Sequence, residues 1–337
     1  MVSSKPYVTA LIFAASLMLL GAGCGSSSAA DGPAIAKVPN LEKTTLNVAV
    51  LPDIDSAGFF IALHEGLFAR EGLTVNYTPA AGSEVIAGQV KGQYDITGGN
   101  YVSYIQAQVS HQADLRIIAE GSLLQPGCQV IMTMPDSRVR TLAQLKGHVL
   151  GVNADANVGY LLVASVLTEN GIAMSTRVSA NAVMFPRTQI PFTERGQALV
   201  SGQVAAAIIA EPQASQMEEK YGAVTLADLD SGATGQFPME GYAVTKAWAK
   251  AHPNTLRAFL AALQAGQQIA DTDRAAIETA FESLKAGQGQ VDRITAAIMA
   301  LNTYPVGVDA TRLQRVANAM QQFGFLKHHF SIQAMLS

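Results

Sequence analysis

The 337-residue sequence predicts an α/β fold built on mostly parallel sheets. From Leu46 onward, short apolar runs alternate with segments of helical periodicity, which is the pattern of βαβ units. Several of these runs are apolar at consecutive positions, as strands buried on both faces of a parallel sheet are. The chain is 49% hydrophobic and 14% charged, which excludes a disordered protein and suits one very large or two ordinary domains.

The first residues predict an export signal. Residues 1–23 carry one charge, Lys5, followed by an apolar run over 7–23. Residues 20–24 (LGAGC) resemble a bacterial lipobox, in which the cysteine is diacylglycerylated and the chain is cut just before it; they depart from the pattern at Gly21, where an aliphatic residue is usual. The resemblance implies a lipid anchor on Cys24 and an extracytoplasmic protein on the bacterial cell membrane. An ordinary secretory signal or a retained anchor helix are the alternatives.

Residues 24–44 are rich in Gly, Ser, Ala and Pro and predict a flexible tether. After it, nine runs predict strands, at 46–51, 74–78, 94–97, 115–120, 129–134, 148–153, 182–185, 205–210 and 241–245. Between the first two, a helical pattern from Phe60 ends at Gly72. The same logic predicts further helices at 85–91, 101–108, 142–145, 158–169, 194–200 and 214–220. Beyond 245 only helices are expected, at 256–269, 275–284, 294–301 and 311–323.

Composition and motifs argue against several function classes. Net charge is −4, with 22 basic and 26 acidic side chains, so no broad nucleic-acid footprint is expected. Two cysteines are too few for a disulfide framework, and we expect Cys128 to be a buried, inert thiol. No nucleophile elbow, phosphate loop or dinucleotide fingerprint occurs, and Phe68 stands where an HExxH zinc helix needs histidine. We therefore expect no catalytic residue, no metal and no cofactor.

The loops after the strands carry small and polar residues at the predicted helix starts. In open α/β sheets these loops, at the carboxyl ends of the strands, are where ligands bind. Ser83, Asn100 and Asn157 could instead be helix N-caps, which is the usual role of these residue types there. Tyr101 and Phe185 could equally be ordinary core aromatics.

Ordered sequence motifs resemble a known family. They are ALHEGLF at 62–68, EGLTV at 71–75, GQYDI at 92–96, TLAQLKG at 141–147, Gly151-Val152, Glu211-Pro212 and GYAVT at 241–245. Together they are similar to the solute-binding proteins of the nitrate, sulfonate, taurine and thiamine-pyrimidine ABC importers, the NMT1-like family. The similarity covers nearly all of the chain beyond the tether.

The resemblance implies a type II periplasmic-binding-protein fold, with two α/β lobes joined by two hinge strands and closing on a small ligand. Lobe I is expected to combine residues 45–126 and 242–337, and lobe II to span 127–241. The crossings are expected at 129–134 and 241–245. The resemblance also implies a monomeric receptor, not an enzyme, whose partners are a small molecule and an ABC permease with its ATPase.

The predicted ligand-binding residues come from both lobes. They are Asp53, Ser56, Ser83, Asn100 and Tyr101 from lobe I, with Asn153, Asp155, Asn157, Phe185, Arg187 and Glu211 from lobe II. The five acids expected near the mouth, Asp53, Asp55, Glu84, Asp155 and Glu211, face Arg187 alone. This balance favours an amine-bearing, zwitterionic or heteroaromatic solute, with taurine-like compounds and pyrimidines ahead of nitrate. A ligand sensor of a signalling system and an enzyme using the same cleft are the alternative functions.

Overall fold

The computed structural model describes residues 40–80, 82–152, 157–185 and 190–336. All of these residues lie within 37–337, which form one compact unit. The predicted signal peptide (1–23), Cys24 and most of the predicted tether (24–44) lie outside the described residues. Within those residues, no helix combines the length and apolar character that crossing a membrane requires.

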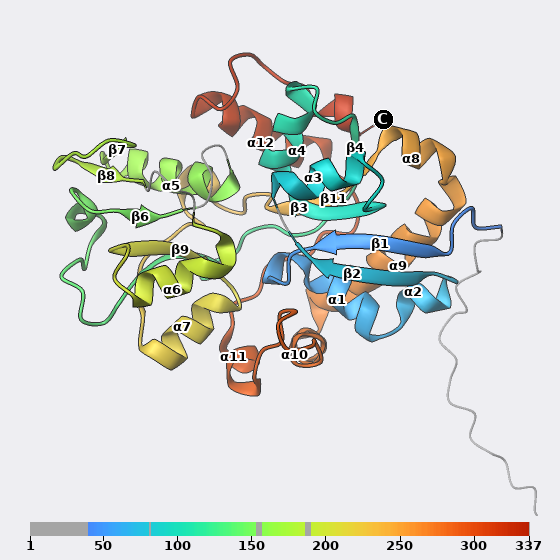
Figure 1. The fold of residues 1–337 in the computed structure, drawn as a ribbon, viewed down its shortest axis with the longest axis horizontal. Coiled ribbons are helices and arrows are strands. Elements are labelled where there is room, and N and C mark those ends of the chain that lie inside the picture. The colour runs from blue at the N-terminus through green and yellow to red at the C-terminus, as the bar shows by residue number, and fades with distance from the viewer. Residues whose placement is uncertain (1–39, 81, 153–156, 186–189, 337) are drawn as a thin grey trace, which may run out of the picture. The chain divides into compact units, whose positions relative to one another are not determined.

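A five-stranded sheet forms the centre of one lobe (Figure 1). Its strands are β1 (Thr45–Val50), β2 (Thr74–Pro79), β3 (Ile96–Asn100), β4 (Leu115–Glu120) and β11 (Glu240–Thr245). Their order is β2-β1-β3-β11-β4, and β11 runs antiparallel to both of its neighbours. Leu46, Val48 and Val50 of β1 are all buried, as the apolar run predicts for a central strand.

Helices from both ends of the chain cover this sheet. The first group is α1 (Ala57–His64), α2 (Leu67–Arg70), α3 (Ser83–Val90) and α4 (Tyr101–Val109). The C-terminal group is α8 (Lys246–Ala251), α9 (Pro253–Thr272), α10 (Arg274–Glu282), α11 (Arg293–Ile298) and α12 (Ala310–Gln322). Helix α9 packs directly on α1, and a side chain at Gly266 would collide with the backbone oxygen of Gly58. Glycine there permits the close approach of the two helices.

A second sheet forms the other lobe. It contains β5 (Gln129–Thr133), β6 (Leu150–Gly151), β9 (Ala206–Ala210) and β10 (Val224–Asp228), in the order β10-β5-β9-β6. Beside it lies the parallel pair β7 (Ala173–Ser175) and β8 (Ala182–Met184), and a bridge between Val149 and Met184 connects β8 to the residue just before β6. The helices of this lobe are α5 (Val158–Glu169), α6 (Arg195–Val200) and α7 (Gln213–Tyr221).

The predicted α/β class and two-lobed architecture are confirmed, but the crossings between the sheets lie earlier than expected. Strand β5 belongs wholly to the second sheet and β11 wholly to the first. The chain passes between them in segments 121–128 and 229–239, which pair through bonds from Leu124 N to Phe237 O (2.9 Å) and from Met239 N to Ser122 O (3.1 Å). An apolar strand is stabilised by a neighbouring strand on each side, so β5 and β11 each stay within one sheet. The chain crosses between the sheets in the segments that precede these two strands.

Most predicted elements are present, with boundaries within a few residues. Helix α5 and strand β4 match their predicted ranges, and among the described residues after β11 no strand is assigned. The region predicted as a helix at 194–200 begins with a short 3-10 turn, Phe192–Glu194. Strands β7 and β10 and helix α8 were not predicted.

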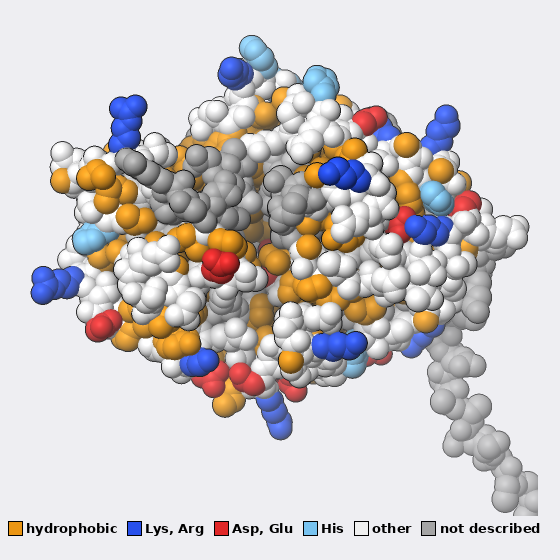
Figure 2. Space-filling model, viewed as in Figure 1, with side chains coloured by type: hydrophobic (Ala, Val, Ile, Leu, Met, Phe, Trp, Pro, Cys, Tyr) orange, Lys and Arg blue, Asp and Glu red, His pale blue; other side chains and the backbone are white. Residues whose placement is uncertain are grey.

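Figure 2 shows that basic side chains are scattered singly over one face of the molecule.

Candidate functional site

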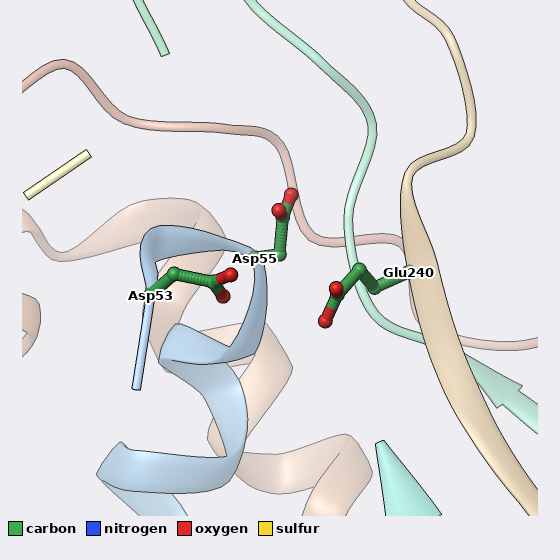
Figure 3. A group of neighbouring side chains, drawn as sticks. All are labelled: Asp53, Asp55 and Glu240. Atoms are coloured by element: carbon green, nitrogen blue, oxygen red, sulfur yellow. The ribbon is translucent and has the colours of Figure 1, made fainter. Parts of the chain in front are cut away.

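Three buried carboxylates meet where the first sheet faces the crossing segments. Asp53 and Asp55 come from the turn after β1, which includes the 3-10 helix Ile54–Ser56, and Glu240 is the first residue of β11. One oxygen of each lies within 4.8 Å of those of the other two. Figure 3 shows the Asp53 and Glu240 side chains reaching toward each other. We call these three residues the acid triad.

Strand pairing explains how Glu240 reaches the triad. Strand β11 runs antiparallel to β3, with Glu240 opposite Asn100, the last residue of β3. The beginning of β11 therefore lies at the edge of the sheet where the parallel strands β1 and β3 end. This is the edge at which open α/β sheets bind ligands.

The triad differs internally in how its oxygens are satisfied. Asp55 Oδ1 accepts hydrogen bonds from Ser122 Oγ (2.5 Å) and Asn302 Nδ2 (2.8 Å), which fix its orientation. Asp53 and Glu240 are only 2% and 8% exposed. Asp53 Oδ1 and Glu240 Oε2 have no hydrogen-bond partner among the described residues. Two buried acceptors are thus left open, which is uncommon in a folded protein.

Burial raises the pKa of all three acids, and repulsion from neighbouring acids adds to the shift for Asp53 and Glu240. Desolvation, followed by the charges of Glu240 and Asp55, holds the pKa of Asp53 well above its usual range. Desolvation and the charge of Asp55 do the same to the pKa of Glu240. Burial raises the pKa of Asp55 to about 6, against the two hydrogen bonds that favour its ionised form. The triad therefore favours holding a proton or another positive charge.

Glu211, at the end of β9, ties the two lobes together. Its carbonyl oxygen accepts a hydrogen bond from Ile54 N (3.1 Å), directly beside the triad. Its carboxylate accepts bonds from Ser215 N (3.0 Å) and Ser215 Oγ (2.8 Å) in its own lobe, and from Ala300 N (3.1 Å) in the segment before α12. Burial raises the pKa of this carboxyl. Both side-chain oxygens of Glu211 thus already have partners within the protein.

Arg195, the first residue of α6, is a buried cation in the second lobe. Its Nη1 donates to Ile208 O (3.0 Å), its guanidinium lies 4.7 Å from the centre of the Phe192 ring, and its Nε has no hydrogen-bond partner among the described residues. Burial lowers the pKa of Arg195 to about 10, opposed by the charge of Asp53. No ion pair joins it to an acid in the part of the chain that the structure describes.

The other predicted site residues take several places. Asn100 and Asn157 are helix N-caps, accepting bonds from Ser103 N (2.9 Å) and Gly159 N (3.0 Å). Ser56 is buried at the end of its 3-10 helix, and Tyr101 is fully buried in the core.

Phe185 is also buried, and its ring lies 4.9 Å from the ring of Tyr160. Ser83 begins α3. Asn153, Asp155 and Arg187 lie outside the described residues. The structure thus brings Asp53 and the Glu211 backbone together, and it places Asn100 at the same sheet edge.

Sequence reasoning missed Glu240 and Arg195 as site residues and counted Asp55 only among the nearby acids. The signal for Glu240 was its position just before a predicted strand, but its relevance depends on that strand running antiparallel into the first sheet. Cys128 is buried as predicted, and burial raises the pKa of its thiol.

Comparison with solved structures gives the same fold at low sequence identity. The alkanesulfonate-binding protein SsuA from Xanthomonas axonopodis pv. citri, bound to MOPS, aligns with a TM-score of 0.69 at 18% identity, covering 87% of this chain and 98% of that one. The aliphatic sulphonate binding protein SsuA from Escherichia coli aligns with a TM-score of 0.66 at 17% identity over 88% and 92%. The nitrate-binding protein NrtA from Synechocystis PCC 6803 aligns with a TM-score of 0.70 at 13% identity over 88% and 86%.

No curated protein sequence matches the chain. The family described as NMT1/THI5 like matches residues 53–275, about two thirds of the chain, including the triad and both crossing segments. The resemblance found in the sequence motifs is therefore confirmed. The chain belongs to the NMT1/THI5-like family.

Proposed function

We propose that this protein is the solute-binding component of an ABC importer, anchored outside the cytoplasm by a lipid on Cys24. It captures a small organic solute, sulfonate- or taurine-like or bearing a pyrimidine or amine, and delivers it to a membrane permease and its ATPase. The observation that carries the proposal is the open pair of buried carboxylate oxygens, Asp53 Oδ1 and Glu240 Oε2, at the ligand-binding edge of a sheet that faces a second lobe. Family membership and the neighbours named for sulfonate and nitrate binding support it.

Capture works by closure of the two lobes. Segments 121–128 and 229–239 connect the sheets, and near the triad the bond from Ile54 N to Glu211 O also joins the lobes. A solute that contacts both lobes only when they are closed shifts the population toward the closed form. The permease then distinguishes loaded from empty protein by the arrangement of the lobes.

The lobes also meet through aromatic rings away from the triad. Tyr160 of α5 lies with its ring 5.5 Å from that of Phe325, which follows α12, and its other side faces Phe185. Phe185, which we propose as a ligand contact, therefore connects to the first lobe through one intervening ring. Closure and ligand contact are coupled in this arrangement because both depend on where α5 sits.

The remaining proposed ligand contacts are Asp53, Ser56, Ser83, Asn100, Tyr101, Asn153, Asp155, Asn157, Arg187 and Glu211. Those with protein partners contribute chiefly by fixing the loops around the solute. Asp53 has an open oxygen and contributes directly.

Native mass spectrometry of residues 25–337, which contain the whole compact unit 37–337, tests the proposal. We expect one solute per chain from a panel of sulfonates, amines, pyrimidines and oxyanions, with a matching rise in melting temperature. Absence of binding across the panel, or conversion of a bound solute to product, contradicts it.

The anchor is tested separately in the full-length chain expressed in a bacterium. Radiolabelled fatty acid should be incorporated, and Cys24→Ala should abolish the label and release the protein from membranes. Two acyl chains suffice for stable anchoring, so equal membrane retention by the variant contradicts lipid attachment at Cys24.

A further inference from the structure

We propose that the solute carries a protonated amine and that this ammonium group is seated in the acid triad. The inference rests on the proposed function and names the charge class of the solute. It assigns direct ligand roles to Glu240, which no sequence motif indicated, and to Asp53, with Asp55 as the positioned third acceptor.

Burying the two open carboxylates of the triad is costly. Removing a carboxylate from water is costly unless hydrogen bonds or an opposite charge compensate it. Asp53 and Glu240 have neither at Oδ1 and Oε2, and no ion pair joins them to a cation among the described residues. A cation donating to both oxygens would compensate the two acids at once.

The spacing of the triad oxygens fits an ammonium group. An ammonium group has three N–H donors in tetrahedral directions, and with hydrogen bonds of about 2.9 Å its acceptors lie about 4.7 Å apart. One oxygen of each triad carboxylate lies within 4.8 Å of those of the other two, so a single nitrogen can reach all three carboxylates. The Asp55 carboxylate is held in place by Ser122 and Asn302, which makes it a fixed side of this seat.

The acid triad disfavours an anion. A sulfonate or nitrate at this position would face three acids, and the buried cation Arg195 is close enough for the charge of Asp53 to raise its pKa. Arg195 donates from Nη1 to Ile208 O and lies over the Phe192 ring, and its Nε is a buried donor without a partner among the described residues. The neighbours named for sulfonate and nitrate binding therefore do not predict the solute of this chain; an anionic group on the solute must lie away from the triad.

Matched pairs of small molecules test the inference on residues 25–337. The pairs are butylamine and butanol, taurine and ethanesulfonate, and aminomethylpyrimidine and hydroxymethylpyrimidine, with Mg²⁺ and Zn²⁺ measured alone. Affinities come from isothermal titration calorimetry and stoichiometry from native mass spectrometry. The variants are Asp53→Asn and Glu240→Gln, which keep the side-chain shape. The matched control is Asp136→Asn, which removes the same charge from an exposed loop.

We expect the amine of at least one pair to bind one to one, and its partner to bind about 30-fold more weakly or not at all. Asp53→Asn and Glu240→Gln should each weaken amine binding by about 30-fold or more, while Asp136→Asn leaves it unchanged. Circular dichroism and melting curves confirm that each variant is folded.

Three results overturn the inference. Equal or tighter binding of the partner lacking the amine, or unchanged amine binding in both triad variants, shows that the solute is not held by an ammonium group; the receptor function then stands. Binding of a divalent metal alone that both triad variants abolish makes the triad a metal site instead. No binding by any compound contradicts the inference and the receptor function together.

Discussion

Glu120 and Glu240 lie one position apart in the pairing of strands β4 and β11, but they differ in whether their carboxylate oxygens have hydrogen-bond partners. Glu120 ends β4 and lies opposite Gly241, the residue after Glu240. Glu120 is 0% exposed, yet both of its oxygens are satisfied: Oε1 accepts from Asp309 N (2.5 Å) and Arg312 Nη2 (3.1 Å), and Oε2 accepts from Arg312 Nε (3.1 Å). Glu240 Oε2 has no such partner among the described residues.

The difference indicates two roles: Glu120 stabilises the fold through its partners, whereas Glu240 has an oxygen available to a ligand. Arg312 lies in the first turn of the C-terminal helix α12, so its bond to Glu120 attaches that helix to the end of β4. The acid triad attaches nothing through its open oxygens. Buried charges in stable proteins are paired, and an exception at a ligand-binding edge indicates a site.

Removing Arg312 should have the largest effect on stability. Arg312→Ala leaves Glu120 buried without its cation, and breaking such a pair typically costs about 3–5 kcal/mol. Because the Arg312 side chain is 34% exposed, water compensates part of this, and we expect a loss of about 2–3 kcal/mol in the free energy of unfolding. Urea denaturation measures it, with Arg138→Ala as an exposed control. Equal stability of the two variants would show that the Arg312 bond to Glu120 does not stabilise the fold, and would contradict the contrast between Glu120 and Glu240.

Neutralising the two kinds of acid should change stability in opposite directions. At about pH 7.5, folding must either bury Asp53 as an unpaired charge or give it a proton, and both are unfavourable. Asp53→Asn should therefore raise the free energy of unfolding by about 1 kcal/mol or more. Glu120→Gln should lower it by about 1–2 kcal/mol because a charge-assisted pair is lost. Urea denaturation without added solute measures both; destabilisation by Asp53→Asn would mean that the triad is structural.

The pH dependence of stability sharpens the assignment of Asp55. Its pKa is about 6 in the folded chain and 3.8 when unperturbed, so the folded chain holds a proton that the unfolded chain loses. The resulting stabilisation is complete below about pH 4 and is lost as the pH rises through about 6. Asp55→Asn keeps an oxygen for Ser122 and Asn302 and removes the titration. The difference in unfolding free energy between variant and wild type should grow in favour of the variant over this window.

Asp53 and Glu240 titrate in the same site, so the comparison is made between single variants and not from the wild-type curve alone. Glu278→Gln, an acid in an exposed pair with Arg274, is the control. A difference between Asp55→Asn and wild type that stays constant from about pH 4 to about pH 7 would show that Asp55 does not titrate in this range.

The smallest effects are expected at polar residues of the site that already have partners. Asn100→Ala and Asn157→Ala each remove an N-cap and should cost about 1 kcal/mol of unfolding free energy. Asn100→Ser and Asn157→Ser keep a capping oxygen and should recover most of it, as thermal melting would measure. If the serine variants recover stability but not solute binding, these residues also contact the solute.

The sequence anticipated the elements whose formation is local. Helix α5 spans a mostly apolar segment after Asn157, and strand β4 is a short, mostly apolar run, so both were located from pattern alone. Strand β10 was missed because it lies at the edge of its sheet, with a neighbouring strand on one side only. Its residues are therefore less buried, and Val224 is 42% exposed. Helix α8 was missed because its six residues are too few to establish a helical period.

By itself, the sequence determined the α/β class, the family motifs and most of the helices and strands, because each depends on periodicity or on residues close together along the chain. The tertiary structure decided which acids meet. Asp53 and Glu240 are separated by most of the chain, and only the antiparallel entry of β11 beside β3 brings Glu240 to the turn after β1. Whether a carboxylate is paired or left open is likewise a property of the packed chain: Arg312 reaches Glu120 from the C-terminal helix, and among the described residues no cation makes the equivalent bond to Glu240.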